Sequence, residues 1–265
     1  PPVSATQESS LSEEERRYLL PLLDAALNKQ GLKLAYQPIV SLDSDTREQY
    51  EVVVRIADDT GRHLDLETCA DWPELGDKLR ALNRLIVQRA MQQLSVQRQK
   101  GQKIGFFVPL AHAALEDETL LKWIHECLHE SSVRGQWVTF QIREAYARKH
   151  LKEAARLMLG LRKANCGIAL EQFGLLPKPE VLLQHLPVDY VKYAPAFVQG
   201  LVKNKDKQQK LVSLNELILD QDVKGIATAV EEAPVLTVLW TAGISYVQGN
   251  FLQEPSEKID FTPDP

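Results

Sequence analysis

The protein has 265 residues, of which 44% are hydrophobic and 25% are charged, and its formal net charge is −5. This length suits two average domains or one large α/β barrel, and the composition is ordinary for a soluble globular protein. A negative net charge excludes a general attraction to nucleic acid or anionic lipid, so a phosphate ligand has to be held by local positive groups. No apolar run is long enough to span a membrane.

The cysteines and the two ends of the chain predict its location and domain limits. Cys69, Cys127 and Cys166 are far apart and form no CxxC pair, which favours reduced core thiols in a cytoplasmic protein. Residues 1–10 are rich in Pro and Ser and are predicted as a linker, and residues 261–265 are predicted as a frayed tail. Between them we expect one domain, residues 11–260, taken from a larger multidomain protein.

The order of the predicted elements indicates an α/β fold. A first helix is expected from Ser12, its N-cap, to just before Gly31. Eight strand-like runs follow, at 34–42, 50–57, 104–110, 137–142, 167–171, 188–193, 224–228 and 244–248. Helical patterns are expected at 75–100, 118–130, 144–164, 179–186, 196–220 and 233–242.

The connections between these strands predict their directions. Residues 43–49 are too few for a helical crossover, so the first two strands are expected to be antiparallel. The remaining strands alternate with helices, which implies a mostly parallel sheet. The sequence therefore predicts a (β/α)₈ TIM-type barrel with an antiparallel first strand.

The second strand has an unusual face. Side chains alternate along a strand, so Glu51, Val53 and Arg55 share one face and Val52 and Val54 the other. Burying the charged face is costly unless its charges have partners. One interpretation is an exposed edge strand with a cross-strand ion pair. The other is a strand that points into the mouth of a cavity, with Arg55 available to an anion.

A TIM-type barrel carries its site at the C-terminal ends of its strands. Few acids occur at these ends, whereas Arg55 suits a phosphate as a bidentate fork and Lys192 as a point charge. The pattern therefore favours anion binding over metal-assisted hydrolysis. The predicted strand ends carry Arg55, Pro109, Gln141, Glu171, Gln172, Lys192, Thr228 and Gln248.

One motif suggests a different chemistry. His125-Glu126-Cys127-Leu128-His129 matches the HExxH signature of zinc metallopeptidases and lies in a helical pattern. No clear third ligand follows it, and a barrel would place this helix on the outside. A metallopeptidase is therefore kept only as a remote alternative.

Five segments together resemble the EAL domain, the family of cyclic di-GMP phosphodiesterases and their inactive relatives. They are Tyr36-Gln37-Pro38-Ile39-Val40, Glu51-Val52-Val53-Val54-Arg55, Phe173-Gly174, Leu186-Pro187-Val188-Asp189-Tyr190-Val191-Lys192 and Tyr246-Val247-Gln248-Gly249. The similarity runs from about Leu11 to Pro255. Within the family, the chain resembles the degenerate EAL domains of type IV pilus regulators.

The departures from the family pattern fall on its metal ligands. The acid of the signature is kept as Glu51, but other ligand positions are changed. By this resemblance, the altered positions are Pro109, Gln141, Glu171-Gln172, Ala194 and Thr228, the last replacing the probable general base. Losing several ligands at once implies that no catalytic residue set and no metal site remain, so no cofactor is required.

The groups with which the family holds the nucleotide are better kept. The resemblance implies that Gln37 hydrogen-bonds the ligand, Val53 and Val54 pack on a guanine, and Arg55 clamps a phosphate. Asn83 replaces an acid that meets a guanine, and an amide can both donate and accept. The implied ligand-binding set is Gln37, Glu51, Val53, Val54, Arg55, Asn83, Lys192, Gln248, Glu254 and Pro255.

The resemblance implies a catalytically inactive, metal-independent receptor for cyclic di-GMP that acts through protein contacts. A PilZ-domain adaptor is the implied partner, in type IV pilus assembly or twitching motility. An alternative is a residual phosphodiesterase that uses Glu51, Glu171 and Glu231 with an unusual metal. A third possibility is a scaffold that binds neither ligand nor metal.

Overall fold

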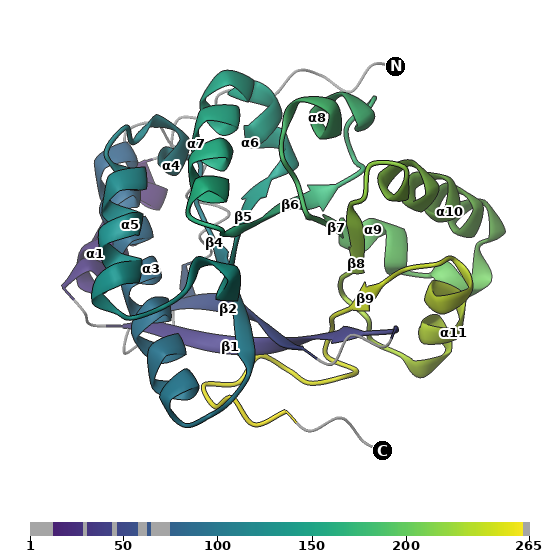
Figure 1. Ribbon diagram of the computed structural model, residues 1–265, viewed down its shortest axis with the longest axis horizontal. Coiled ribbons are helices and arrows are strands. Elements are labelled where there is room, and N and C mark those ends of the chain that lie inside the picture. The colour runs from purple at the N-terminus through teal and green to yellow at the C-terminus, as the bar shows by residue number, and fades with distance from the viewer. Residues whose placement is uncertain (1–12, 29–30, 44–46, 58–62, 65–74, 262–265) are drawn as a thin grey trace.

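The strands of the protein close into a barrel surrounded by helices (Figure 1). This computed structural model describes residues 13–28, 31–43, 47–57, 63–64 and 75–261, so Ser12, Cys69 and the linker 1–10 lie outside the described residues. The barrel order is β1 (Leu32–Ser41), β2 (Glu48–Ala57), β4 (Ile104–Pro109), β5 (Val138–Arg143), β6 (Gly167–Phe173), β7 (Tyr190–Tyr193), β8 (Lys224–Ala227) and β9 (Tyr246–Val247). The predicted eight-stranded barrel is confirmed.

The first strand closes the barrel in an antiparallel sense, as predicted. β1 pairs with β2 from Leu32↔Ile56 to Ile39↔Gln49, and its end pairs with β9 at Val40↔Val247. The other neighbouring barrel strands are parallel. An unpredicted strand, β3 (His63–Leu64), extends the sheet beside β2.

Helices cover the outside of the barrel, and two of the predicted helices are broken. The run expected at 144–164 forms two helices that meet at His150, whose φ of −122° is not helical. The run expected at 196–220 is interrupted where Gly200 takes a φ of +68°. The helices are α1 (Glu13–Leu27), α3 (Gly76–Gln99), α4 (Ala113–Glu116), α5 (Leu120–Glu130), η2 (Gly135–Trp137), α6 (Glu144–Lys149), α7 (Leu151–Lys163), α8 (Glu180–His185), α9 (Pro195–Val198), η3 (Leu201–Lys203), α10 (Lys205–Leu219) and α11 (Ala233–Thr241).

The interior of the barrel is layered. The main hydrophobic core lies between the strands and the helices, and a second, small cluster lies inside the barrel. Buried polar residues occur on the inward positions towards the C-terminal ends of the parallel strands. This inner apolar layer therefore separates the two mouths of the barrel, and it is formed by Ile39, Phe107, Ala169, Ile226 and Tyr246.

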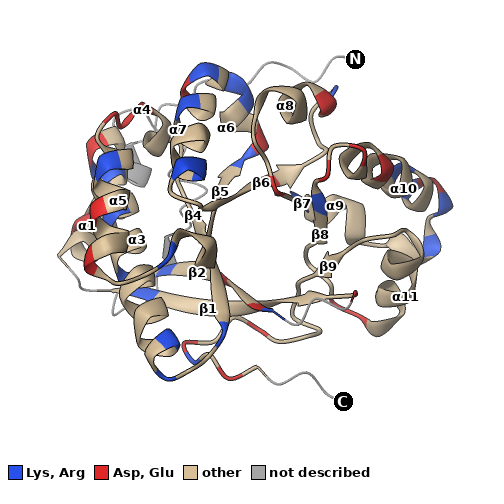
Figure 2. Cartoon of the chain, in the orientation of Figure 1, with Lys and Arg blue, Asp and Glu red and all other residues tan. Residues whose placement is uncertain are grey.

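Charged residues lie mainly on the helices and loops around the barrel (Figure 2). Cys127 and Cys166 are buried free thiols, in agreement with their prediction as core cysteines. Among the described residues, no helix has both the length and the apolar character needed to cross a membrane.

Candidate functional site

A cavity of about 190 Å³ opens at the C-terminal ends of the barrel strands. Here residues of β1, β2, β6 and β7 converge with residues that directly follow β8 and β9. They meet because the C-terminal ends of the parallel strands lie at one rim, and antiparallel β1 contributes Gln37 from the middle of the strand. The lining residues are Gln37, Glu51, Glu171, Gln172, Lys192, Tyr193, Pro195, Thr228, Ala229 and Gln248.

Glu51 is the centre of a hydrogen-bond network inside this cavity. The Lys192 ammonium and the Gln141 amide donate to its Oε1, the latter at 2.7 Å, and the Gln248 amide donates to its Oε2. Lys192 also lies 3.8 Å from Glu171. The side chains of Lys192 and Glu51 are only 6% and 16% exposed. Of the two interpretations of the second strand, the cavity mouth is the one observed.

The two carboxylates differ in their electrostatics. Burial raises the pKa of Glu51, but Lys192 and the hydrogen bonds from Gln141 and Gln248 outweigh it and hold that pKa below its ordinary value. Burial raises the pKa of Glu171 to about 7, and the Glu51 charge adds to this while Lys192 opposes it. One carboxylate is therefore ionised, while the other titrates near neutral pH.

Two non-glycine residues of the cavity have left-handed backbone conformations. Gln172 and Ala229 both have a φ of 55°. The strand register between β6 and β7 also shifts between Leu170 and Phe173, which places the irregularity at Glu171 and Gln172. Such conformations cost of order 1–3 kcal/mol each and gather at binding sites.

The C-terminal segment lies against β1 and completes the rim. Tyr36 and Ser256 exchange two backbone hydrogen bonds, of 2.7 and 3.1 Å. The Gln37 amide donates to Asn250 Oδ1 and to the Gln253 carbonyl, both at 3.1 Å. The Gln248 amide in turn donates to Gln37 Oε1 at 3.0 Å. Gln37 therefore links the cavity to the chain that follows β9.

Arg55 and the Glu254–Pro255 pair, expected to meet the ligand together, lie side by side. The exposed Arg55 guanidinium donates to the Pro255 carbonyl at 3.0 Å. Glu254 is exposed beside it. Val53 shares the inward face of β2 with Arg55 and is half-buried, whereas Val54 faces outward and packs against the main core. Val53 therefore shares a strand face with Glu51, but neither valine lines the cavity, and Arg55 does not line it either.

Asn83 lies on α3 and is buried. Its Oδ1 accepts a hydrogen bond of 2.9 Å from the backbone N–H of Ala111, in the connection after β4. Its Nδ2 is buried and makes no hydrogen bond within the described part of the chain. A buried donor without a partner is uncommon, and Asn83 does not line the cavity.

Among the described residues, the cavity does not offer a set of side chains that fits a divalent cation. Within the described residues, no group of three or more His, Cys, Asp or Glu side chains is placed to hold a metal ion. The two carboxylates that line the cavity, Glu51 and Glu171, both lie against Lys192. The Thr228 hydroxyl donates to the Tyr193 carbonyl at 2.8 Å.

Two further acids lie outside the cavity lining. Glu144 accepts a hydrogen bond of 2.9 Å from Gly174 N and lies 3.6 Å from Arg148, so it holds the loop after β6. Glu231 is exposed and does not line the cavity. A third carboxylate from Glu231, as the residual phosphodiesterase would need, is not provided by this arrangement.

The HExxH motif forms no site either. His125 and His129 are exposed on α5, outside the barrel, and a ring nitrogen of His125 bonds the Leu121 carbonyl at 3.0 Å. Since the described residues hold no three-ligand cluster, the remote metallopeptidase alternative loses its structural basis.

Sequence reasoning missed part of the cavity wall. Tyr193, Pro195 and Ala229 line the cavity but were not predicted, whereas Glu171, Gln172 and Thr228 were predicted at strand ends but not in the ligand-binding set. The left-handed conformations of Gln172 and Ala229 have no signal in the sequence, since neither residue favours a positive φ in the way that glycine does. The register shift in β6 lies between Leu170 and Phe173, and the successive residues Glu171 and Gln172 both line the cavity, which strict alternation does not predict.

Comparisons with known proteins agree with this geometry. The family model described as "EAL domain" matches residues 22–255. The chain is 28% identical over 231 residues to the cyclic di-GMP phosphodiesterase PdeB of Shewanella oneidensis, and the match covers 87% of this chain but 27% of that protein. The chain thus spans about a quarter of the length of this relative.

Two solved structures share the fold closely. The crystal structure of a FimX EAL domain superposes with a TM-score of 0.85 at 33% identity, over 92% of this chain and 98% of that one. The FimX EAL domain of Pseudomonas aeruginosa bound to c-di-GMP has the same TM-score and coverage at 31% identity. The fold of this chain is therefore that of these EAL domains.

Proposed function

Because the chain belongs to the EAL domain family, we propose that it binds cyclic di-GMP at the C-terminal mouth of its barrel without metal and without hydrolysing it. In this role the bound nucleotide acts as a signal, which the protein passes on through contacts with another protein. The FimX EAL domain of Pseudomonas aeruginosa, which shares the fold, has been crystallised with c-di-GMP bound, and this supports the choice of ligand.

The observation that carries the proposal is that Glu51 and Glu171 are the only carboxylates among the described lining residues of the cavity, and that both lie against Lys192. The Lys192 ammonium also lies near Gln141, whose Oε1 is 3.5 Å away. The lysine ammonium contacts the same two carboxylates that a divalent ion would need as ligands. Lys192 supplies positive charge, but unlike a metal ion it neither acts as a Lewis acid nor activates a bound water. We infer that phosphate is held at this mouth but not attacked.

The outer rim supplies the remaining contacts in this proposal. Arg55 uses one guanidinium nitrogen for the Pro255 carbonyl, so its other donors can meet a phosphate oxygen. Glu254 can accept from a guanine edge and Pro255 can pack on its face. Asn83 Nδ2, which has no partner in the described structure, can donate to a guanine acceptor.

Titration of cyclic di-GMP into the protein in excess EDTA tests this function, followed by chromatography of the recovered nucleotide. We expect binding with the nucleotide intact, and a loss of about tenfold or more in Arg55→Ala. Arg156→Ala is the matched control. Arg156 lies on the outer helix α7, away from the cavity, and its guanidinium pairs with Glu118. Turnover that appears when Mn²⁺ is restored would overturn the proposal of inactivity. If the nucleotide binds neither in EDTA nor with Mn²⁺, the proposed receptor function is wrong and the scaffold alternative holds.

We further propose a PilZ-domain adaptor as partner and a role in type IV pilus assembly or twitching motility. This part rests on the likeness to FimX EAL domains, one of which shares 33% of its sequence with this chain. The same calorimetric sample can be titrated with a purified PilZ-domain protein, with and without the nucleotide. Binding that needs cyclic di-GMP supports the adaptor, and no binding in both samples contradicts it.

A further inference from the structure

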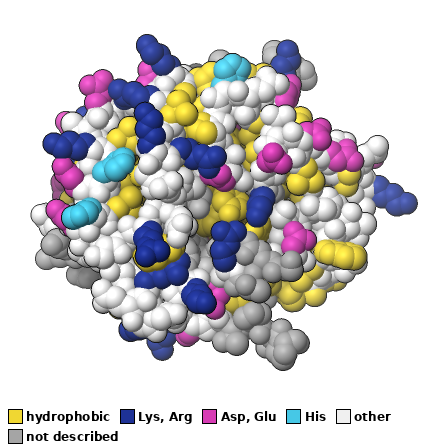
Figure 3. All heavy atoms as spheres, in the orientation of Figure 1, with side chains coloured by type: hydrophobic (Ala, Val, Ile, Leu, Met, Phe, Trp, Pro, Cys, Tyr) yellow, Lys and Arg dark blue, Asp and Glu magenta, His cyan; other side chains and the backbone are white. Residues whose placement is uncertain are grey.

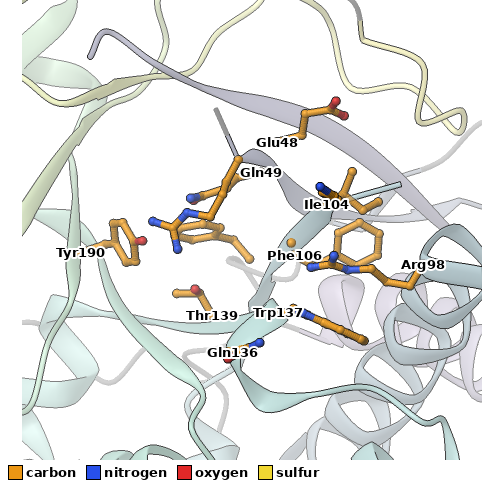
Figure 4. Close-up of a pocket in the computed structure, with 13 residues that line it drawn as sticks. Glu48, Gln49, Arg98, Ile104, Phe106, Gln136, Trp137, Thr139 and Tyr190 are labelled. Atoms are coloured by element: carbon orange, nitrogen blue, oxygen red, sulfur yellow. The ribbon is translucent and has the colours of Figure 1, made fainter. Parts of the chain in front are cut away.

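A second and larger cavity, of about 400 Å³, lies at the opposite, N-terminal mouth of the barrel. It is lined by residues at or near the starts of β2, β4, β5 and β7, among them Gln49, Ile104, Thr139 and Tyr190 (Figure 4). The inner apolar layer of the barrel separates it from the cavity that holds Lys192. Its volume is within the range of small-molecule pockets.

Positive charge gathers at this mouth. Arg47, Arg98 and Lys103 line the cavity, and Glu48 is the only acid among its lining residues. The Glu48 side chain points away from the cavity (Figure 4), and it hydrogen-bonds Tyr50. Figure 3 shows Lys and Arg side chains around a hollow near the centre of the visible face.

The arginines at this mouth crowd one another. The guanidinium carbons of Arg98 and Arg134 lie 4.1 and 5.5 Å from the centre of the Trp137 ring. Burial and the charge of Arg134 lower the pKa of Arg98, and Arg98 Nε is buried without a hydrogen bond within the described residues. Among the described residues, no ion pair joins Arg98 or Lys103 to an acid. An anion would relieve this repulsion.

The floor of the cavity is aromatic and carries an unused acceptor. Tyr190 meets Phe107 edge to face, with ring centres 5.1 Å apart, and Phe107 belongs to the inner apolar layer. Figure 4 places Tyr190 on one side of the cavity and Arg98 with Trp137 on the other. Between them, Gln49 is 8% exposed, and its Oε1 is buried with no hydrogen-bond partner in the described residues.

From this combination, we propose that the N-terminal mouth is a second ligand site, which binds a nucleotide: a small phosphorylated molecule with an aromatic ring. The ring lies against Tyr190 and Phe107, where its edge can donate to Gln49 Oε1. The phosphates meet Arg98 and Lys103 at the rim. In a purely structural cluster, Arg98 Nε would have an acceptor and Gln49 Oε1 would have a donor among the described residues.

Calorimetric titration of ADP into the protein tests this site, with pyrophosphate and adenosine as the phosphate-only and ring-only probes. We expect ADP to bind with one-to-one stoichiometry and more tightly than either fragment. Arg98→Gln should weaken ADP binding about tenfold, because a charge-assisted contact is lost. Lys103→Gln, a change at an exposed residue, should weaken it about two- to fivefold. Arg156→Gln on α7 is the control and should change nothing.

Two further measurements make the outcome decisive. Gln49→Leu should keep the fold and weaken ADP but not pyrophosphate, because only the ring contact is lost. Saturating cyclic di-GMP should leave ADP binding unchanged if the two mouths are separate sites. The proposal is overturned if ADP fails to bind at about millimolar concentration, if pyrophosphate binds equally well, if the Arg98 and Lys103 variants bind normally, or if cyclic di-GMP displaces ADP.

Discussion

Lys192 is the cation that the two carboxylates of the C-terminal cavity share. It is 6% exposed and contacts both Glu51 and Glu171. An ion pair exposed to water contributes little to protein stability, but the members of this pair are shielded from solvent. Removing one charge leaves the other without a partner, so the cavity depends on both residues together.

A double-mutant cycle measures this dependence. Lys192→Met leaves the ionised Glu51 buried, and we expect the free energy of unfolding to fall by about 3–5 kcal/mol. Lys192→Met combined with Glu51→Gln should recover part of this loss, because a neutral amide needs no counter-ion and its single oxygen can still accept from Gln141 or Gln248. Urea unfolding of the four proteins gives the coupling energy. Additive effects of the two substitutions would contradict the pairing.

The second residue-scale prediction concerns the effect of pH on Glu171. Its pKa is about 7 in the folded protein, against an ordinary value of 4.5. Between these values the folded state binds the extra proton, so the free energy of unfolding falls as pH rises from about 4.5 to 7 and stays reduced above that window. The loss is up to about 3 kcal/mol.

Urea unfolding at pH 5 and at pH 8 measures this loss in the parent protein and in Glu171→Gln. The neutral variant should gain stability over the parent at pH 8 and little at pH 5. An equal difference between the two proteins at both pH values would show that Glu171 does not titrate in this window.

At the scale of elements, the corner after β9 positions the cavity glutamine. Gln248 N donates to the Ala227 carbonyl at 2.9 Å, and Val230 N donates to the Gln248 carbonyl at 3.0 Å. Gly249 follows so closely that an added Cβ would lie 2.1 Å from the Val230 carbonyl oxygen. Because this contact is with backbone, no side-chain rotation can relieve it. The close approach of the two segments therefore requires glycine.

Gly249→Ala should separate these two segments. We expect it to lower the free energy of unfolding by about 2 kcal/mol or more and to weaken cyclic di-GMP binding by displacing Gln248. Gly76→Ala is the matched control: its added Cβ would lie no nearer than 3.5 Å to a flexible arginine side chain, at the start of α3. That change should be neutral or slightly stabilising. Thermal unfolding and calorimetry give both readouts, and equal behaviour of the two variants would contradict the role of Gly249.

The elements could be predicted where one physical signal dominates. The apolar runs of the eight barrel strands have no competing interpretation, so their existence and order followed from the sequence. The break at His150 has neither Gly nor Pro to mark it, and only tertiary packing ends the helix there. The register shift at Glu171 and Gln172 depends on contacts with β7, which are remote in sequence.

At the scale of the whole molecule, the barrel has two polar mouths with an apolar layer between them. The residues of the C-terminal mouth, such as Glu51 and Lys192, could be assigned from strand ends and from the family resemblance. The N-terminal mouth could not, because Arg98, Lys103 and Trp137 belong to a helix end, a loop and a 3₁₀ turn that share no motif. Their proximity is a property of the closed barrel and has no local pattern.

The antiparallel closure by β1 also sets the order in which the protein can be completed during synthesis. β1 is the first strand made, yet one of its partners is β9 and another is the residue Ser256. At about 5–20 residues per second, roughly 10–40 s of translation separate them. Until then the hairpin of β1 and β2 has an open edge with unpaired backbone groups, a surface on which nascent chains aggregate. Pro38, which lacks an N–H, lies within that strand. The barrel is therefore closed only by the last part of the domain to emerge from the ribosome.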